Sequence, residues 1–299
     1  MNLRLVSFLA TDKIRLPGLL YEPDKKTQKA AIYLHGNGSS SIFYSTDRMN
    51  SLGETLNANG IAFFPFNNRG AHYMKTLHRM DESDEHIEYG MTYELIKECV
   101  LDIDGAIEFL KGYGYSEFYL IGHSTGANKI VVYNKYKPEN DVKKYILLAG
   151  GDDTGGYYQL LGKNKFENLL TKLKKEIEAG NGRKLISKYL VSLIISHQSL
   201  YDTINPDGDY NIFPYWEYMK RLKLSKKSLF DEYKHIEKPT LVIYGNEDEY
   251  CYGNVKKCIE ILQKVTEEKN NFSYSIIEET NHGFDGKFNE LAQIISKWL

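Results

Sequence analysis

The sequence has little cysteine and lacks long apolar stretches. Three cysteines in 299 residues are too few, and odd in number, for a disulfide framework, and a reducing compartment fits this count best. No apolar run approaches the ~20 residues that cross a bilayer, so we expect no membrane association. The apolar stretch within residues 1–12 is too short and interrupted for a signal peptide and predicts a strand. We therefore expect a cytoplasmic protein.

The sequence also has no large excess of positive or negative charge. Lys and Arg number 38 against 40 Asp and Glu, which gives a formal net charge of −2. This balance provides no general attraction to polyanions, so nucleic acid is excluded as an expected partner. The sequence also lacks H-E-x-x-H, Cys/His clusters with zinc spacing and a Walker A motif. We expect no metal site.

Short, continuous apolar segments alternate with segments of helical periodicity. Such strands indicate a sheet that is covered on both faces, and the alternation with helices predicts a mostly parallel α/β sheet flanked by helices. Two further strands, at 3–9 and 14–21, precede this pattern, and a polar loop follows residue 70. The predicted strands are 30–34, 61–66, 117–121, 144–149, 239–245 and 272–277, and the predicted helices include 45–58, 91–111 and 253–266.

The alternation stops at Gly150-Gly151. From there to residue 237 the pattern is helical or irregular, with no convincing buried strand. We interpret 151–237 as an inserted, mainly helical cap. The core domain would then consist of 1–150 and 238–299.

A G-x-S-x-G motif occupies residues 122–126, between a predicted strand and a predicted helix. This is the context required of a nucleophile elbow, in which the serine occupies a strained turn and larger side chains two residues away would collide with neighbouring elements. The alternative is a tight turn in which Ser124 only caps the helix. We favour Ser124 as a nucleophile.

A base and an acid with suitable positions follow Ser124 in the chain. His282 comes after the last strand, at the same edge of the sheet as Ser124, although a lone histidine is more often a surface or capping residue. Asp248 follows the preceding strand and is our candidate for the acid that orients His282. Glu247 and Glu249 are immediate neighbours that compete for this role, and the alternative for Asp248 is a plain solvated loop acid.

An oxyanion hole requires two backbone N–H groups that point at the developing negative oxygen. Thr125, the residue after the candidate nucleophile, would provide one. The loop after strand 30–34 would provide the second, from Asn37. The alternative is a glycine turn that binds no ligand.

Four segments together resemble the α/β-hydrolase superfamily, in its esterase/lipase or serine-aminopeptidase-like branch. They are 33–36, 122–126, 245–248 and 281–284, and the likeness covers about 1–150 and 238–299. The resemblance implies Ser124 as nucleophile, His282 as base, Asp248 as acid, and Asn37 with Thr125 as oxyanion hole. It implies two-step acyl transfer on a small-molecule ester or thioester, with no metal or organic cofactor.

Two rival functions remain open. An amidase or peptidase would use the same triad and would need an acid for a substrate amine, for which Glu217, Asp202 and Asp231 are candidates. A ligand-sensing protein would keep the fold without turnover. The expected partner in each case is a small molecule, and a homodimer is left open.

Aromatic residues are abundant, with 24 Tyr and 13 Phe. Most should pack as ordinary amphipathic residues, and some are candidates for an apolar substrate pocket. Within the aromatic segment 212–219, Tyr215 and Trp216 are our candidates for the pocket wall. The equally weighted alternative is a helix of the insertion that packs its apolar side onto the core.

Overall fold

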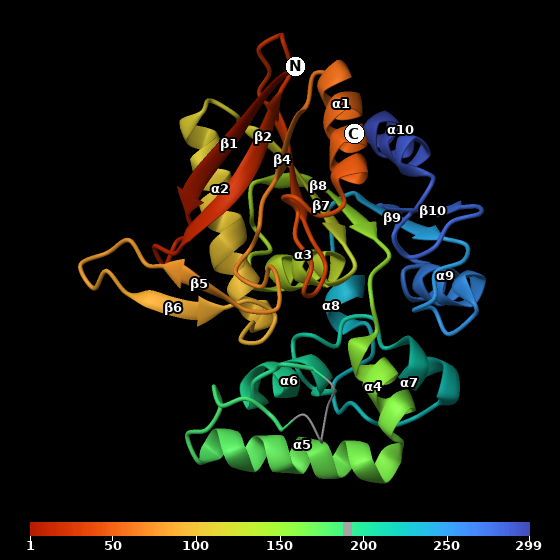
Figure 1. The fold of residues 1–299 in the computed structure, drawn as a ribbon. Coiled ribbons are helices and arrows are strands. Elements are labelled where there is room, and N and C mark those ends of the chain that lie inside the picture. The colour runs from red at the N-terminus through yellow and green to blue at the C-terminus, as the bar shows by residue number, and fades with distance from the viewer. Residues whose placement is uncertain (188–192) are drawn as a thin grey trace.

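The computed structural model describes residues 1–187 and 193–299. Within these ranges eight strands form one sheet in the order β1-β2-β4-β3-β7-β8-β9-β10 (Figure 1). β1 and β2 pair antiparallel at one edge, and the strands from β4 to β10 run parallel. The strands are β1 (Asn2–Leu9), β2 (Arg15–Glu22), β3 (Lys29–Leu34), β4 (Ala62–Pro65), β7 (Glu117–His123), β8 (Val142–Leu148), β9 (Thr240–Gly245) and β10 (Phe272–Ile277).

Burial explains the two kinds of strand in the sheet. Every residue of β9 is buried, as are all residues of β3 after Lys29 and all of β7 after Glu117, because helices cover both faces. In β1, which lies at the edge, exposed residues recur along most of the strand. The predicted mostly parallel α/β sheet is therefore confirmed, with an antiparallel pair added at its N-terminal edge.

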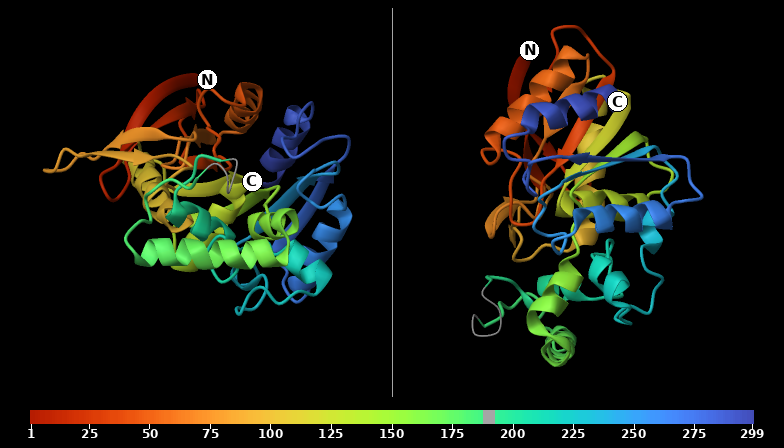
Figure 2. Two further views of the ribbon diagram at one scale, coloured as in Figure 1. Left: turned by 60° about the horizontal axis from the view of Figure 1, so that its bottom comes forward. Right: turned by 90° about the vertical axis from the view of Figure 1, so that its right-hand side faces the viewer.

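Helices flank the sheet on opposite faces (Figures 1 and 2). Helix α1 packs against α10 on one face, and α2 packs against α3 on the other. Each presents an apolar side to the sheet, with residues such as Leu52, Ile103, Ile130 and Leu291 fully buried. The helices of the core are α1 (Thr46–Ala58), α2 (Cys99–Gly112), α3 (Thr125–Tyr136), α9 (Val255–Val265) and α10 (Phe288–Trp298).

Residues 70–98 differ from the prediction. The polar loop contains a two-stranded hairpin, β5 (Lys75–His78) and β6 (His86–Tyr89), in which the rings of His78 and His86 stack 4.4 Å apart. The helix predicted to begin at 91 begins at Cys99, after a 3₁₀ turn (η1, Ile96–Glu98). Thr92 is held outside the helix by two hydrogen bonds. Its N–H donates to the backbone carbonyl of Tyr73, and its hydroxyl donates to that of Ile194.

Between β8 and β9 the described residues form helices and loops, with one isolated bridge between Leu185 and Ser196. These helices lie beyond the carboxyl ends of the parallel strands (Figure 1). Those within residues 153–204 have their own hydrophobic cluster, which includes Phe166, Leu173 and Leu200, and the two later helices pack into the main core. Residues 188–192 of the predicted insertion lie outside the described residues. The helices are α4 (Asp153–Leu161), α5 (Lys163–Glu178), α6 (His197–Ile204), α7 (Tyr215–Lys220) and α8 (Asp231–Lys234).

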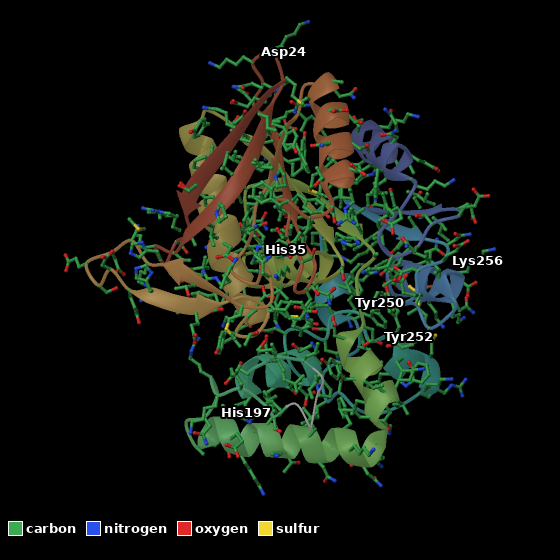
Figure 3. The ribbon with its side chains drawn as sticks, viewed as in Figure 1. Asp24, His35, His197, Tyr250, Tyr252 and Lys256 are labelled. Carbon is green, nitrogen blue, oxygen red and sulfur yellow. The ribbon has the colours of Figure 1, made fainter. Side chains whose placement is uncertain are left out.

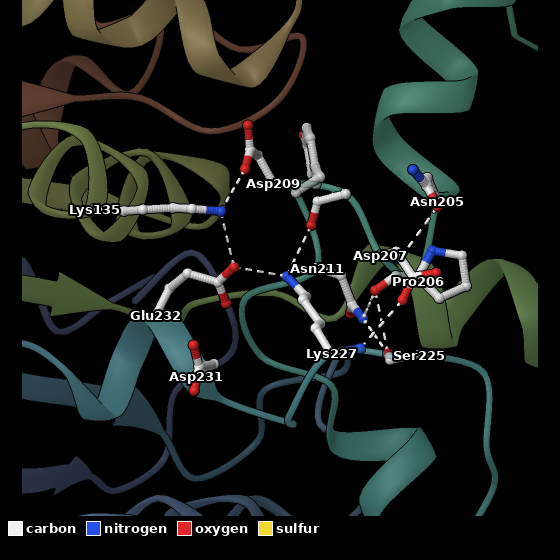
Figure 4. A network of polar contacts seen from close by, with 12 residues as sticks. Lys135, Asn205, Pro206, Asp207, Asp209, Asn211, Ser225, Lys227, Asp231 and Glu232 are labelled. Carbon is white, nitrogen blue, oxygen red and sulfur yellow. Dashed lines mark hydrogen bonds and ion pairs between the residues drawn. The ribbon is translucent and has the colours of Figure 1, made fainter.

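Ion pairs fix the segment after α6 onto the core (Figure 4). Lys135 of α3 contacts Asp209 at 2.7 Å and Glu232 of α8 at 3.1 Å, and Lys227 contacts the same Glu232 carboxylate at 2.9 Å. A single core lysine thus connects two parts of the segment. In the described ranges, no helix is both long enough and apolar enough to cross a membrane.

Candidate active site

The loops that follow β3, β7, β8, β9 and β10 meet at one edge of the sheet, because the carboxyl ends of parallel strands share an edge. They enclose a cavity of about 740 Å³ together with part of α4. Ser124, His282, Asn37 and Thr125 all line this cavity. Four of the five residues predicted for the chemistry therefore face one space.

Ser124 lies in a sharp turn between β7 and α3. Its backbone has φ 57° and ψ −127°, a conformation that costs free energy in a non-glycine residue, and its N–H donates to Leu148 at 2.8 Å. A Cβ atom at Gly122 would lie 2.2 Å from the carbonyl oxygen of Gly126, and one at Gly126 would lie 2.2 Å from that of Leu34. The turn therefore requires glycine at both positions, as the sequence analysis inferred.

Asp248 and His282 are in direct contact. Nδ1 of His282 lies 3.0 and 3.1 Å from the two carboxylate oxygens of Asp248, which is only 2% exposed. Asp248 is held in turn by the N–H of Tyr250 at 2.9 Å. Of the competing acids, Glu249 accepts from the backbone N–H of His282, and the side chain of Glu247 is exposed. Asp248 is the acid that contacts the imidazole ring.

Ser124 and His282 line the same cavity, but no hydrogen bond joins their side chains in the described part of the chain. A hydrogen bond from His123, the residue before Ser124, connects the two segments instead. Nε2 of His123 lies 2.8 Å from the backbone carbonyl of His282. Burial lowers the pKa of His123 well below its usual range, so the ring is neutral and donates this hydrogen bond. His123 was not among the predicted site residues, and only its adjacency to Ser124 could have marked it.

The two backbone groups proposed for an oxyanion hole also lie at this edge of the sheet. Thr125 is the first residue of α3, and Asn37 lies in the loop after β3. Within the described ranges, neither N–H donates to another protein group. Gly36 packs closely against the candidate nucleophile, since a Cβ at this position would lie 2.9 Å from Ser124 Cβ.

The comparisons with known proteins agree with this architecture. The family described as "Protein of unknown function (DUF1749)" matches residues 76–299, from the β5–β6 hairpin to the C-terminal helix. The chain belongs to this family. No curated protein sequence matches it.

Solved structures place the DUF1749 chain in the α/β-hydrolase fold. The Pyrococcus furiosus esterase Pf2001 has a TM-score of 0.59 at 15% identity, with 100% of this chain and 90% of that chain covered. Est1E from Butyrivibrio proteoclasticus, solved with ferulic acid bound, has a TM-score of 0.63 at 15% identity, with 97% and 96% covered. The meta-cleavage product hydrolase CumD from Pseudomonas fluorescens has a TM-score of 0.55 at 15% identity, with 98% and 96% covered. The resemblance to the α/β-hydrolase superfamily is confirmed at the level of fold.

Tyr215 and Trp216 are not among the residues that line the cavity of this DUF1749 chain. Tyr215 is 1% exposed, and its hydroxyl lies 2.8 Å from that of Tyr244. The ring of Trp216 packs on Tyr252, with 4.8 Å between ring centroids. The predicted pocket wall is therefore corrected, because the aromatic segment packs onto the core, which was the weighed alternative.

Other side chains form the cavity wall opposite the sheet. Tyr157 comes from α4, and Tyr250 and Tyr252 come from the loop after β9 (Figure 3). Asp152 and Asp153 follow β8 and also line the cavity. The sequence analysis missed these residues, although the position of the two aspartates directly after a predicted strand was a signal of the kind used for Asp248.

Asp152 and Asp153 differ in their partners. Asp152 accepts hydrogen bonds from the N–H groups of Gly155 and Trp216 and from the hydroxyl of Tyr252, at 2.7 to 2.9 Å. No other residue of the described chain donates a hydrogen bond to the carboxylate of Asp153. Burial raises the pKa of each carboxyl to about 6, and His282 lowers that of Asp153 in opposition.

The three acids considered as partners for a substrate amine lie outside the cavity lining. Glu217 accepts from the backbone N–H groups of Leu224 and Ser225, at 2.7 and 2.9 Å. Asp202 accepts from the N–H of Ile96, and Asp231 forms an ion pair with Lys234. Each has a structural partner away from Ser124.

Proposed function

We propose that this DUF1749 protein is a serine hydrolase that cleaves a small-molecule carboxylic ester or thioester through an acyl-enzyme on Ser124. The contact of His282 Nδ1 with the buried Asp248 carries the proposal, because His282 lines the same cavity as Ser124, which occupies a strained turn. A buried carboxylate on Nδ1 fixes the tautomer of a histidine so that Nε2 can accept a proton. The similarity in fold to several esterases agrees with an ester substrate.

The proposed reaction has two acyl-transfer steps. His282 removes the proton of the Ser124 hydroxyl as its oxygen attacks the carbonyl carbon, and Asp248 stabilises the imidazolium that forms. The N–H groups of Asn37 and Thr125 stabilise the negative oxygen of the tetrahedral intermediate. The bond to the alcohol or thiol then breaks, and His282 returns its proton to the leaving group. Water repeats the sequence on the acyl-enzyme and releases a carboxylic acid and free Ser124.

The segment 151–237 is proposed to act as the cap of this site. Its first helix, α4, contributes Tyr157 and Leu160 to the cavity wall. Because α4 begins five residues after β8 ends, the same loop that leaves the sheet also turns toward Ser124. When an insertion forms the cavity wall, it determines which substrates fit, while the loops of the sheet hold the reacting groups.

A panel of p-nitrophenyl esters and aminoacyl anilides tests the proposal. We expect ester turnover by the wild type, with a loss in kcat of about a million-fold in Ser124→Ala and of about ten-thousand-fold in Asp248→Asn. Glu247→Gln is the matched control, because it removes a negative charge from the same loop at an exposed side chain and should leave kcat unchanged. Anilide cleavage in place of ester cleavage would identify an amidase, and no turnover of either class would overturn the proposal.

A further inference from the structure

The charged residues that line the cavity all carry negative charge. They are Asp152, Asp153 and Glu249, and no lysine or arginine of the described residues joins them. Tyr157, Tyr250 and Tyr252 supply aromatic surface in the same wall. A partly buried cavity with acidic and aromatic walls disfavours an anion and favours a cation, because carboxylates attract it and ring faces stabilise it.

Of the three carboxylates in this cavity, Asp153 is the one that accepts no hydrogen bond from another described residue. Asp152 already caps α4 through the N–H of Gly155, and it binds Trp216 and Tyr252 as well. Glu249 holds the backbone N–H of His282 at 3.1 Å. Asp153 is partly buried, and among the described residues only its own backbone N–H donates to its carboxylate, although desolvation raises its pKa to about 6. A carboxylate that has lost part of its water and has so few donors is stabilised when a ligand supplies another donor.

The position of Asp153 restricts what such a donor can be. The carboxylate interacts electrostatically with His282 and with the hydroxyl groups of Tyr157, Tyr250 and Tyr252, and all of these residues line the same cavity. The cavity that holds it also holds Ser124. A positively charged donor bound there would belong to the same molecule as the carbonyl under attack.

We propose that Asp153 binds a protonated amine of the substrate, so that the substrate class is a cationic ester or thioester. This inference rests on the proposed function, since it names the substrate of that same site. The ammonium group donates a charge-assisted hydrogen bond to Asp153, and the tyrosine rings pack around its alkyl substituents. Asp153 is a specificity residue in this scheme, separate from the groups that make and break bonds.

Two pairs of thioesters test the inference, each pair differing only in a dimethylamino group replaced by isopropyl. The first pair is 2-(dimethylamino)ethyl and 3-methylbutyl thioacetate, with the charge on the leaving group. The second is the phenyl thioesters of 4-(dimethylamino)butanoate and 5-methylhexanoate, with the charge on the acyl group. Tertiary amines are used because they carry one N–H donor when protonated and form no stable amide by acyl migration. The uncatalysed release of thiol, which the unprotonated amine accelerates, is subtracted for each thioester. Release of thiol is measured for the full chain.

We expect the wild type to prefer the cationic member of at least one pair by about tenfold or more in kcat/KM, as one charge-assisted hydrogen bond implies. Asp153→Asn should remove most of that preference through KM and leave the neutral member within about threefold. Asp231→Asn makes the same change of charge at a surface ion pair and should keep the preference.

The outcomes separate this inference from the proposed function. Equal turnover of cationic and neutral members by the wild type, or a preference that survives in Asp153→Asn, would overturn the role of Asp153 and leave the hydrolase intact. Absence of turnover for all four thioesters, together with absence of ester turnover in the panel above, would overturn both.

Discussion

The imidazole of His123 donates a hydrogen bond from Nε2 to the backbone carbonyl of His282, across 2.8 Å. The two residues are far apart in the sequence, and the bond links the turn that carries Ser124 to the loop that carries the candidate base. Since a carbonyl can only accept, Nε2 must carry the proton, in agreement with the lowered pKa of this buried ring. His123 therefore positions His282 relative to Ser124.

Replacement of His123 tests this positioning role. In His123→Ala the His282 loop loses its link to the turn, and a displacement of about 1 Å at a reacting group can cost about a hundredfold in rate. We expect kcat for p-nitrophenyl acetate to fall by more than about tenfold with a smaller change in KM, and His123→Gln, which keeps an N–H donor, to restore part of it. An unchanged kcat in folded His123→Ala would show that the bond is dispensable.

The glycine at position 126 gives a prediction about the turn itself. A Cβ there would meet the carbonyl oxygen of Leu34 at 2.2 Å, so Gly126→Ala must displace either β3 or α3. We expect a loss of about 1–3 kcal/mol in the free energy of unfolding and a loss of ester turnover. Gly112→Ala is the matched control, because a Cβ at this helical position meets nothing within 4 Å. Equal stability of the two variants in urea would contradict the account.

The cation preference should depend on pH. Burial raises the pKa of Asp153 to about 6, with His282, Asp152 and the tyrosines as the titratable groups around it. The carboxylate is charged above that pKa and neutral below it, so the preference is present above about pH 6 and lost as the pH falls through this value. We expect the ratio of kcat/KM for the cationic and neutral thioesters to show this transition.

Asp153→Asn provides the control for that titration. Its amide does not ionise, so the ratio should stay low and flat across the same pH range. A wild-type ratio that is constant through about pH 6, or a transition that persists in Asp153→Asn, would assign the titration to another group.

The sheet was predictable because inner parallel strands such as β3 and β9 are buried on both faces and therefore appear as continuous apolar runs. The start of α2 was not predictable from the sequence. Leu95 continues the apolar period of the helix, yet its backbone is extended at φ −113° and ψ 126°. The hydrogen bonds of Thr92 to Tyr73 and Ile194 hold this part of the chain, and both partners are remote in the sequence. Tertiary contacts of this kind override local periodicity.

The candidate site was also predictable only in part. Ser124, Asp248 and His282 were candidates because each follows a recognisable strand, and the parallel sheet brings such positions to one edge. The wall of the cavity depends on which side chains the insertion turns inward. Tyr215 and Tyr157 are both aromatic residues of short helices, but the former packs into the core and the latter lines the cavity. Composition and period do not distinguish these two environments.

Intact-mass spectrometry after exposure to a fluorophosphonate shows whether Ser124 is an activated nucleophile. We expect a single covalent adduct on the wild type and none on Ser124→Ala, with Asp248→Asn labelled far more slowly. A wild-type protein without an adduct, or an adduct of equal yield on Ser124→Ala, would contradict this role of Ser124.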